Sequence, residues 1–264
     1  MSRKDIYFNE GEDEGMFAAN MAARQTFKFF WRELSWEQRR IVPGLGLSVV
    51  KMPFVNVNQQ EGEPEAEHMW ISEIRFDGVS ILGTLMSEPQ WVDTVEVGDD
   101  VSVPLEEIDD WMYTINDVAF GGYTINYLRS KMSKQERTQH DNAWGIYFGD
   151  PNIIEIVPIK EFGISTESGQ APTFAELERI EHPMSDDSRE QYREAFTNDP
   201  SLITWTDDEG WTLLHRESLA GNLTPVQLLL EHGADRHFKT PTGYTAIDLA
   251  EKMGWPAIVE LLKS

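Results

Sequence analysis

A group of polar residues in the first half of the chain could perform general acid–base chemistry. It consists of His68, Asp99, Asp109 and Asp110, which would act together if the fold gathers them around the imidazole. A paired carboxylate at Asp109 and Asp110 is disfavoured, because successive side chains of a strand point to opposite faces of the sheet. An enzyme that uses His68 and nearby carboxylates is therefore one hypothesis for the function.

The residues for several other chemistries are missing from this sequence. It holds no cysteine, no Gly-x-Ser-x-Gly, no phosphate-binding glycine loop and no His-Glu-x-x-His. Glu65, Glu67 and His68 form a cluster of metal-ligand residue types, but we do not expect it to bind a metal. We expect no catalytic residue and no cofactor.

Apolar periodicity predicts the elements that would position these side chains. A helix is expected from about Met16 to Arg40, because Phe27, Phe30, Trp31 and Leu34 have the spacing of one buried helical face. Strands are expected at 47–57, at 68–76 with a bulge, at 79–86, within 97–104, at 110–115 and at 152–159. The dipeptide Asp77–Gly78 predicts a hairpin between the second and third of these strands.

Between the last two strands we expect helices from Thr124 to Met132 and over 133–143. Gly121 and Gly122 would form a sharp turn, and the Thr124 side chain would cap the helix that follows. Trp70 and Trp111 are expected on neighbouring strands, with apolar rings in the core and an indole N–H that needs an acceptor. Ligand-facing positions remain an alternative for Trp70 and Trp111, and for His68, Tyr113 and Tyr123.

The C-terminal part contains an internal repeat with a step of 33 residues, which relates Gly210 to Gly243 and Thr212 to Thr245. The run from Thr212 to His215 resembles the corner of an ankyrin repeat, and we expect His215 to bond to backbone there. Two copies cannot close a core, so residues 189–210 are expected to form a degenerate first repeat, with Leu202 and Ile203 in its second helix. Shorter helices are expected at 173–181 and 188–197, after a linker at 165–173.

Several ordered motifs in the first half resemble the YegJ-like family, a bacterial domain of unknown function. The motifs are His68-Met69-Trp70, Gly83-Thr84-Leu85 with Pro89, Gly98-Asp99-Asp100-Val101, Asp110-Trp111-Met112-Tyr113 and Gly121-Gly122-Tyr123-Thr124. The resemblance covers roughly residues 16–135. It implies a fold, and it implies no chemistry.

The charge of the chain is strongly negative, at −24, which disfavours nucleic-acid binding because that binding needs basic residues to neutralise phosphates. From Glu61 to Asp117 there are sixteen acids and one basic residue, Arg75. One interpretation is solubility, and the other is an acidic face that binds a basic partner. The candidate residues of that face are Asp93, Glu96, Asp99, Asp100, Glu106, Glu107 and Asp109.

These patterns predict an α+β protein with a curved antiparallel sheet and packed helices, followed by an all-α ankyrin stack. The expected division is a flexible N-terminus (1–15), an α+β domain (16–165), a linker and helix (166–184) and a repeat domain (185–264). The sequence shows no secretory signal and no apolar run near the ~20 residues that span a membrane, so we expect a cytoplasmic protein. The oligomeric state stays open.

The function expected from these features is protein binding, in the form of an immunity-type protein that occludes a basic bacterial toxin. A housekeeping adaptor or regulator is the other non-enzymatic alternative.

Overall fold

The computed structural model describes residues 13–160, 163 and 172–264. Contacts divide the chain into two units. Unit 1 comprises Met1–Phe30 and Val42–Val157, and unit 2 comprises Trp31–Ile41 and Pro158–Ser264. The division falls inside helix α1 (Glu14–Glu37), so this helix contributes residues to both units. Most of the expected flexible N-terminus and most of the expected linker at 165–173 lie outside the described residues.

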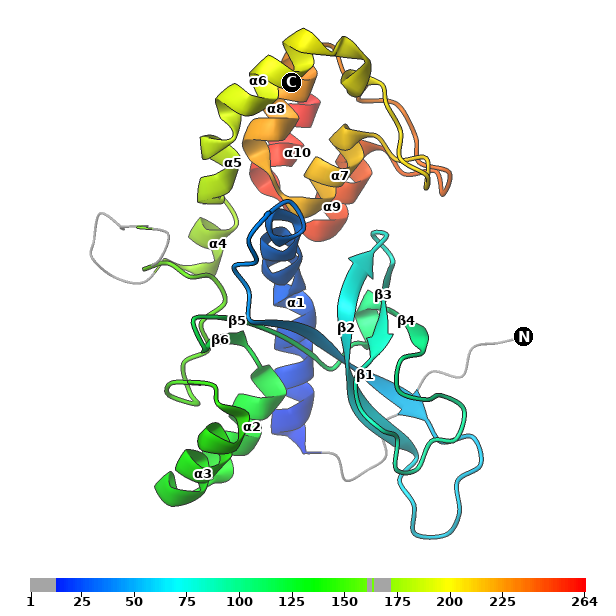
Figure 1. Cartoon of the computed structure of the whole chain (residues 1–264), viewed down its shortest axis with the longest axis vertical. Coiled ribbons are helices and arrows are strands. Elements are labelled where there is room, and N and C mark those ends of the chain that lie inside the picture. Colours follow the sequence, from blue (N-terminus) through cyan, green and yellow to red (C-terminus); the bar gives the residue numbers. More distant parts are fainter. Residues whose placement is uncertain (1–12, 161–162, 164–171) are drawn as a thin grey trace. The chain divides into compact units, whose positions relative to one another are not determined.

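Unit 1 is built on a six-stranded antiparallel sheet with the order β4-β3-β2-β1-β5-β6 (Figure 1). The strands are β1 (Leu47–Val55), β2 (Ala66–Phe76), β3 (Ser80–Leu85), β4 (Asp100–Pro104), β5 (Asp110–Ile115) and β6 (Val118–Gly121). The remaining elements are a 3-10 turn η1 (Leu105–Glu107) and the helices α2 (Tyr123–Lys131) and α3 (Lys134–Trp144). The predicted α+β class is confirmed at this level.

The β2–β3 hairpin forms as the sequence predicts. Gly78 takes a φ of +83°, and the Asp77 carboxylate accepts hydrogen bonds from the backbone N–H groups of Val79 and Ser80. The expected bulge in β2 is also present, because the β2–β3 register shifts between Ser72 and Arg75.

The core of unit 1 lies between the sheet and the first part of α1. Phe27 packs edge-on against Phe76 at 5.3 Å, and Phe30 contacts Trp111 at 5.7 Å between ring centroids. The Trp111 indole N–H donates to the backbone oxygen of Ala23 at 2.8 Å, which supplies the acceptor that a buried indole needs.

Two expectations about these aromatic residues are wrong. The helix does not bury a single face, since every residue from Thr26 to Trp36 is buried. Trp70 and Trp111 are not on neighbouring strands, because β1 lies between β2 and β5 and pairs with both.

The start of α2 is fixed by Asp110, a fully buried residue at the first position of β5. Its carboxylate accepts hydrogen bonds from the N–H groups of Tyr123 and Thr124 and from the Thr124 hydroxyl. The expected cap by Thr124 is therefore wrong, because this residue lies inside the helix and donates to the cap. Gly121 and Gly122 make the expected sharp turn, with φ values of +77° and +69°.

The segment expected as a strand at 152–159 forms no strand. Its Glu155 carbonyl accepts a hydrogen bond from Gly121 N–H, while the neighbouring Ala119 N–H donates to the Tyr147 carbonyl. The sixth strand, β6, was not expected, because its four residues are too few to show an alternating pattern.

Unit 2 consists of the last turns of α1 and a set of short helices. They are α4 (Phe174–Leu177), α5 (Pro183–Asp187), α6 (Arg189–Asn198), α7 (Leu213–Ala220), α8 (Leu223–Glu231), α9 (Ala246–Met253) and α10 (Pro256–Lys263), with a 3-10 turn η2 (Pro200–Ile203). Leu202 and Ile203 thus lie in a 3-10 turn and not in the second α-helix expected for a first repeat. Pro200, which cannot donate a backbone hydrogen bond, begins this turn.

The 33-residue step of the sequence recurs in the geometry of α7 and α9. Thr212 and Thr245 each form a capping box at the start of the helix, and Gly221 and Gly254 end the helices in the left-handed region. His215 bonds to backbone as expected, since its Nε2 lies 3.0 Å from the Phe238 carbonyl oxygen. The identification of these helices as an ankyrin stack stays a prediction.

Asp110 makes the stability of the protein depend on pH. Burial raises the pKa of this carboxyl from 3.8 to about 6, although the hydrogen bonds from α2 oppose the rise. Because the folded state holds the proton more tightly than the unfolded state, the contribution of Asp110 to stability is largest in acid and falls as the pH rises from about 4 to 6. A rise of this size corresponds to about 3 kcal/mol.

We expect Asp110→Asn to destabilise the protein, because the amide nitrogen cannot accept the N–H of Thr124. The deficit relative to the unmodified protein should be larger at pH 4 than at pH 7, as measured by urea unfolding at both pH values. An equal deficit at the two pH values would contradict a titrating Asp110.

Candidate partner-binding surface

Exposed carboxylates gather on the connections of unit 1 that flank β2 and β3. The β1–β2 loop and the β3–β4 connection leave the same end of the sheet (Figure 1). We call the exposed acids of these connections and of the start of β4 the acidic surface, and they are Glu61, Glu65, Glu88, Asp93, Glu96, Asp99 and Asp100.

Neutral donors hold several carboxylates of these connections. The Asn58 amide donates to both oxygens of Asp93, at 3.0 and 3.1 Å, and so ties the β1–β2 loop to the β3–β4 connection. The Glu67 carboxylate accepts the N–H groups of Gln90 and Trp91 at 2.9 and 3.0 Å. These contacts fix the connections and leave the negative charges in place, since no cation takes part in them.

Cations near the acidic surface are scarce. Arg75 is the one basic residue between Glu61 and Asp117, and its guanidinium lies 3.7 Å from Asp100, with both side chains mostly exposed. A pair this exposed and this long is screened by solvent and contributes little. The acidic surface therefore carries a large excess of negative charge.

Three of the expected acids lie elsewhere. Glu106 and Glu107 form η1, beside the Arg24 guanidinium, whose Nε donates to the Ile108 carbonyl at 2.7 Å. Burial lowers the pKa of Arg24, and the charges of Asp109, Glu107 and Glu106 oppose that effect. These acids thus lie near a partly buried cation, whereas Arg75, the cation beside the acidic surface, is mostly exposed.

Asp109 is a correction to the expected acidic face, because it is only 4% exposed. Its carboxylate lies 2.6 Å from Nδ1 of His68, a residue whose side chain is about half exposed. Of the acids proposed for proton transfer, only Asp109 reaches His68. Asp110 points to α2, and Asp99 accepts the N–H of Glu96 in the turn before β4. The expected set of four residues does not converge on one imidazole.

The other residues considered as ligand-facing are largely internal. Trp111, Tyr113 and Tyr123 are buried, and Tyr113 stacks on Phe120 at 5.0 Å. Trp70 is half-buried against an apolar cluster that includes Met112. Among these positions His68 alone is exposed.

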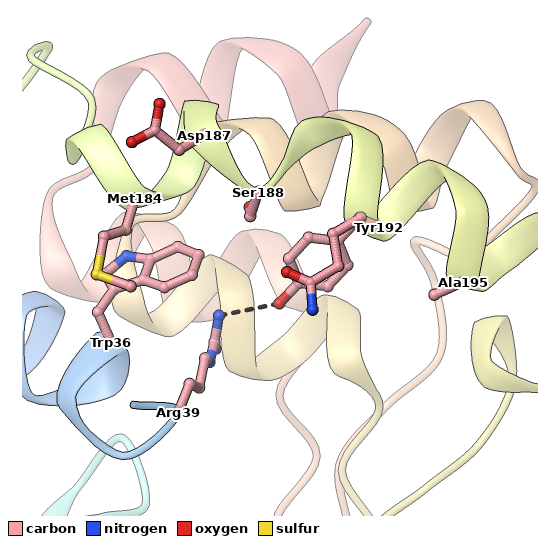
Figure 2. A pocket seen from close by; sticks show the side chains of 8 residues that line it. Trp36, Arg39, Met184, Asp187, Ser188, Tyr192 and Ala195 are labelled. Atoms are coloured by element: carbon pink, nitrogen blue, oxygen red, sulfur yellow. Dashed lines mark hydrogen bonds between the residues drawn. The ribbon is translucent and has the colours of Figure 1, made fainter. Parts of the chain in front are cut away.

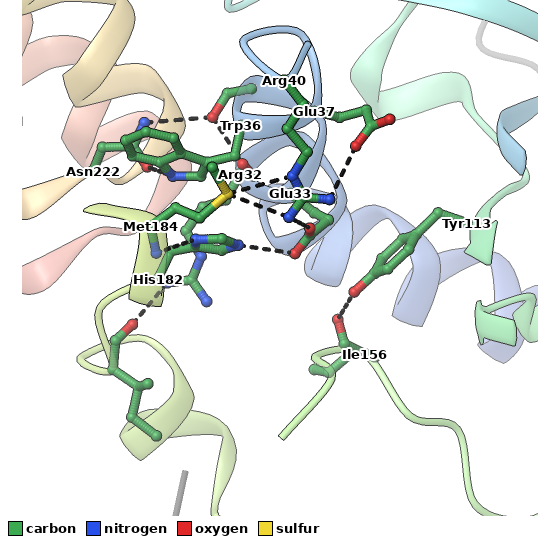
Figure 3. Close-up of polar contacts among 12 residues, drawn as sticks. Arg32, Glu33, Trp36, Glu37, Arg40, Tyr113, Ile156, His182, Met184 and Asn222 are labelled. Carbon is green, nitrogen blue, oxygen red and sulfur yellow. Dashed lines mark hydrogen bonds and ion pairs between the residues drawn. The ribbon is translucent and has the colours of Figure 1, made fainter. Parts of the chain in front are cut away.

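In unit 2 the last turns of α1 carry a polar network (Figure 3). The Trp36 indole N–H donates to the Asn222 side-chain oxygen at 2.8 Å, and its ring stacks on His182. Nε2 of His182 lies 3.0 Å from Glu33, while its Nδ1 accepts the N–H of Met184. Burial lowers the pKa of His182, and Glu33 opposes that effect. The imidazole therefore acts as a neutral bridge.

Arg39 extends this network to the repeat helices. Its guanidinium donates to Glu217 at 2.9 Å. It also donates to the Tyr192 hydroxyl at 3.0 Å (Figure 2). Glu217 is 1% exposed and also accepts from Asn222 at 2.8 Å. A pocket of 480 Å³ opens beside these groups, between Trp36 and α5–α6. Sequence reasoning missed this arrangement, because its partners are far apart in the chain.

Among the described residues, no group of three or more His, Asp or Glu side chains is placed to hold a metal ion. In the same part of the chain, no helix has the length and apolar character needed to cross a membrane.

Comparison with known proteins identifies the first half of the chain. A family model described as "Uncharacterized protein conserved in bacteria (DUF2314)" matches residues 13–148. The chain belongs to this family. YegJ of Escherichia coli K12 is 36% identical over 70 residues, which are 26% of this chain and 46% of that protein. These matches confirm the family resemblance.

A relative of nearly equal length carries both parts. A Neisseria meningitidis serogroup B protein named as an ankyrin repeat protein is 42% identical over 98% of this chain and 96% of its own length. Mouse protein phosphatase 1 regulatory subunit 27 is 42% identical over 55 residues, which are 21% of this chain and 36% of that protein. No solved structure matches the chain significantly. Neither the family description nor the name of the Neisseria relative specifies a catalytic activity.

The Glu67 contacts predict how the β3–β4 connection is held in place. In Glu67→Ala, the N–H groups of Gln90 and Trp91 lose their acceptor, and we expect their hydrogen exchange to become about ten-fold faster. Glu88→Ala removes an exposed acid of the same connection and serves as the control. Exchange unchanged in Glu67→Ala, or equally faster in both variants, would show that Glu67 does not hold the connection.

Proposed function

We propose that this chain is a protein-interaction protein whose acidic surface binds a basic protein partner. The observation that carries the proposal is that carboxylates of the acidic surface are bonded to neutral donors and not to cations. Asp93 is bound by an amide and Asp99 by a backbone N–H, so no cation neutralises either carboxylate in these contacts. The segment from Glu61 to Asp117 contains one arginine and sixteen acids. Such a surface attracts a positively charged partner and accelerates its encounter.

Unit 2 supports a binding role in a different way. The Neisseria relative is named as an ankyrin repeat protein, and the paired helices of this chain repeat with a step of 33 residues. We therefore propose a repeat domain over 185–264, joined through 166–184 to the α+β domain over 16–165, with the last turns of α1 completing the repeat domain. Stacked repeats present extended surfaces to other proteins and have no chemistry of their own.

The finer form of the proposal is an immunity-type protein of the cytoplasm, whose partner is a basic bacterial toxin that it occludes. The net charge of −24 supports this form, because a basic toxin would be captured by complementary charge. A captured partner that is toxic when expressed alone, and harmless when co-expressed with this chain, is the expected result. A captured partner without toxicity would favour the adaptor or regulator.

Charge reversal tests the acidic surface. We expect Asp93→Lys combined with Glu96→Lys to slow association with the partner isolated from the host by about ten-fold at low ionic strength, as measured by stopped-flow. The difference should shrink as salt is added, because screening removes the steering.

The matched control is Glu194→Lys combined with Asp208→Lys, which makes the same change in net charge at exposed positions of unit 2. Equal slowing by both pairs would point to net charge alone. Association that depends on neither pair nor on salt would exclude the acidic surface as the binding site.

A further inference from the structure

The connections that carry the acidic surface also expose large apolar side chains. Val57 belongs to the β1–β2 loop, while Met86, Trp91 and Val97 belong to the β3–β4 connection, and all are exposed. Trp91 is 45% exposed, although tryptophan side chains are highly buried on average. We call these four residues the apolar patch.

Hydrogen bonds join the segments that carry the residues of the apolar patch. The N–H of Gly98 donates to the Leu85 carbonyl at 3.0 Å. Val97 precedes Gly98 and Met86 follows Leu85, so each is next in sequence to one member of this bonded pair. The Asn58 amide is bonded to Asp93 and joins the β1–β2 loop to the β3–β4 connection. Val57 is next to Asn58 in sequence, and Trp91 is two residues before Asp93. The backbone N–H of Trp91 is bonded to Glu67 at 3.0 Å, while the side chain of Trp91 is 45% exposed.

Apolar groups surrounded by anions restrict the kind of partner. A purely basic, polar segment would satisfy the carboxylates and leave the Trp91 ring exposed to water. A purely apolar segment would cover the ring and remove water from the charges of Asp93 and Glu96 without replacing it, which is costly. A segment with both kinds of side chain meets both requirements, since interfaces place apolar anchors at the centre and charged groups at the rim.

We propose that the apolar patch binds a basic, amphipathic segment of a partner protein, in which apolar side chains that cover Trp91 alternate with Lys or Arg side chains that pair with the acidic surface. A Lys or Arg side chain of the segment that lies over the Trp91 ring would add a cation–π interaction. This inference rests on the proposed function, and it adds the apolar half of the recognition.

Two synthetic peptides test the inference on the full chain. One repeats Lys-Leu and the other repeats Lys-Ser, so they carry the same charge and differ in their apolar side chains. We expect the Lys-Leu peptide to bind about ten-fold more tightly by isothermal titration calorimetry, and Trp91→Ala to abolish this preference. Trp144→Ala, which removes a 41% exposed tryptophan from another part of unit 1, should retain the preference.

The outcomes separate the inference from the proposed function. If the peptides bind equally, or if Trp144→Ala removes the preference as fully as Trp91→Ala does, the apolar patch is not the site and the inference is wrong. If Asp93→Lys with Glu96→Lys still weakens both peptides in that case, the acidic surface stands on its own. If that charge reversal has no effect on either peptide, the proposed function fails as well. Because Trp91 is exposed, its replacement should leave the melting temperature within about 2 °C, which is checked by thermal unfolding.

Discussion

Hydrogen bonds from neutral donors to carboxylates are the interaction on which unit 1 depends. The segment from Glu61 to Asp117, with sixteen acids and one arginine, must form the four strands β2 to β5 and the connections between them, and like charges oppose that compaction. The chain uses the acids as acceptors in its own turns. Asp77 closes the β2–β3 hairpin, and Glu67 and Asp93 hold the β3–β4 connection. Some acids of this segment thus help to hold its turns, and they keep their negative charge because the donors in these contacts are neutral.

The neighbouring residues Asp109 and Asp110 have different hydrogen-bond partners, although no local sequence pattern distinguishes them. Asp109 is buried next to a half-exposed imidazole, and Asp110 is fully buried at the start of β5, where its carboxylate accepts the first N–H groups of α2. Each carboxylate joins a different pair of elements. Asp109 connects β2 with the start of β5, and Asp110 connects β5 with α2. Successive side chains of an extended chain point in opposite directions, which is why the sequence disfavours a carboxylate pair at these positions. The same alternation directs the two carboxylates to separate partners.

The elements that the sequence predicted well are those with local causes. The Asp77–Gly78 turn, the bulge in β2 and the 33-residue step all depend on residues within a few positions of each other or on a repeated spacing. The features that were missed depend on residues distant in sequence. Nothing near Trp36 indicates that Asn222, 186 positions later, accepts its indole N–H. The burial of Asp109 was missed for the same reason, because an acid in an acidic run is expected to be exposed unless its histidine partner is known.

Glu217 has a consequence for the architecture of unit 2. The residue 33 positions after Glu217 is Ala250, and both are buried. The two copies of the repeat therefore differ at a buried position, which holds a carboxylate in the first copy and a methyl group in the second. The glutamate is accommodated only because Arg39, Tyr192 and Asn222 surround it. A tandem duplication of the first copy would bury a second anion with no arginine to meet it, at a cost of several kcal/mol. A further copy of that module would therefore need a cation of its own at this position.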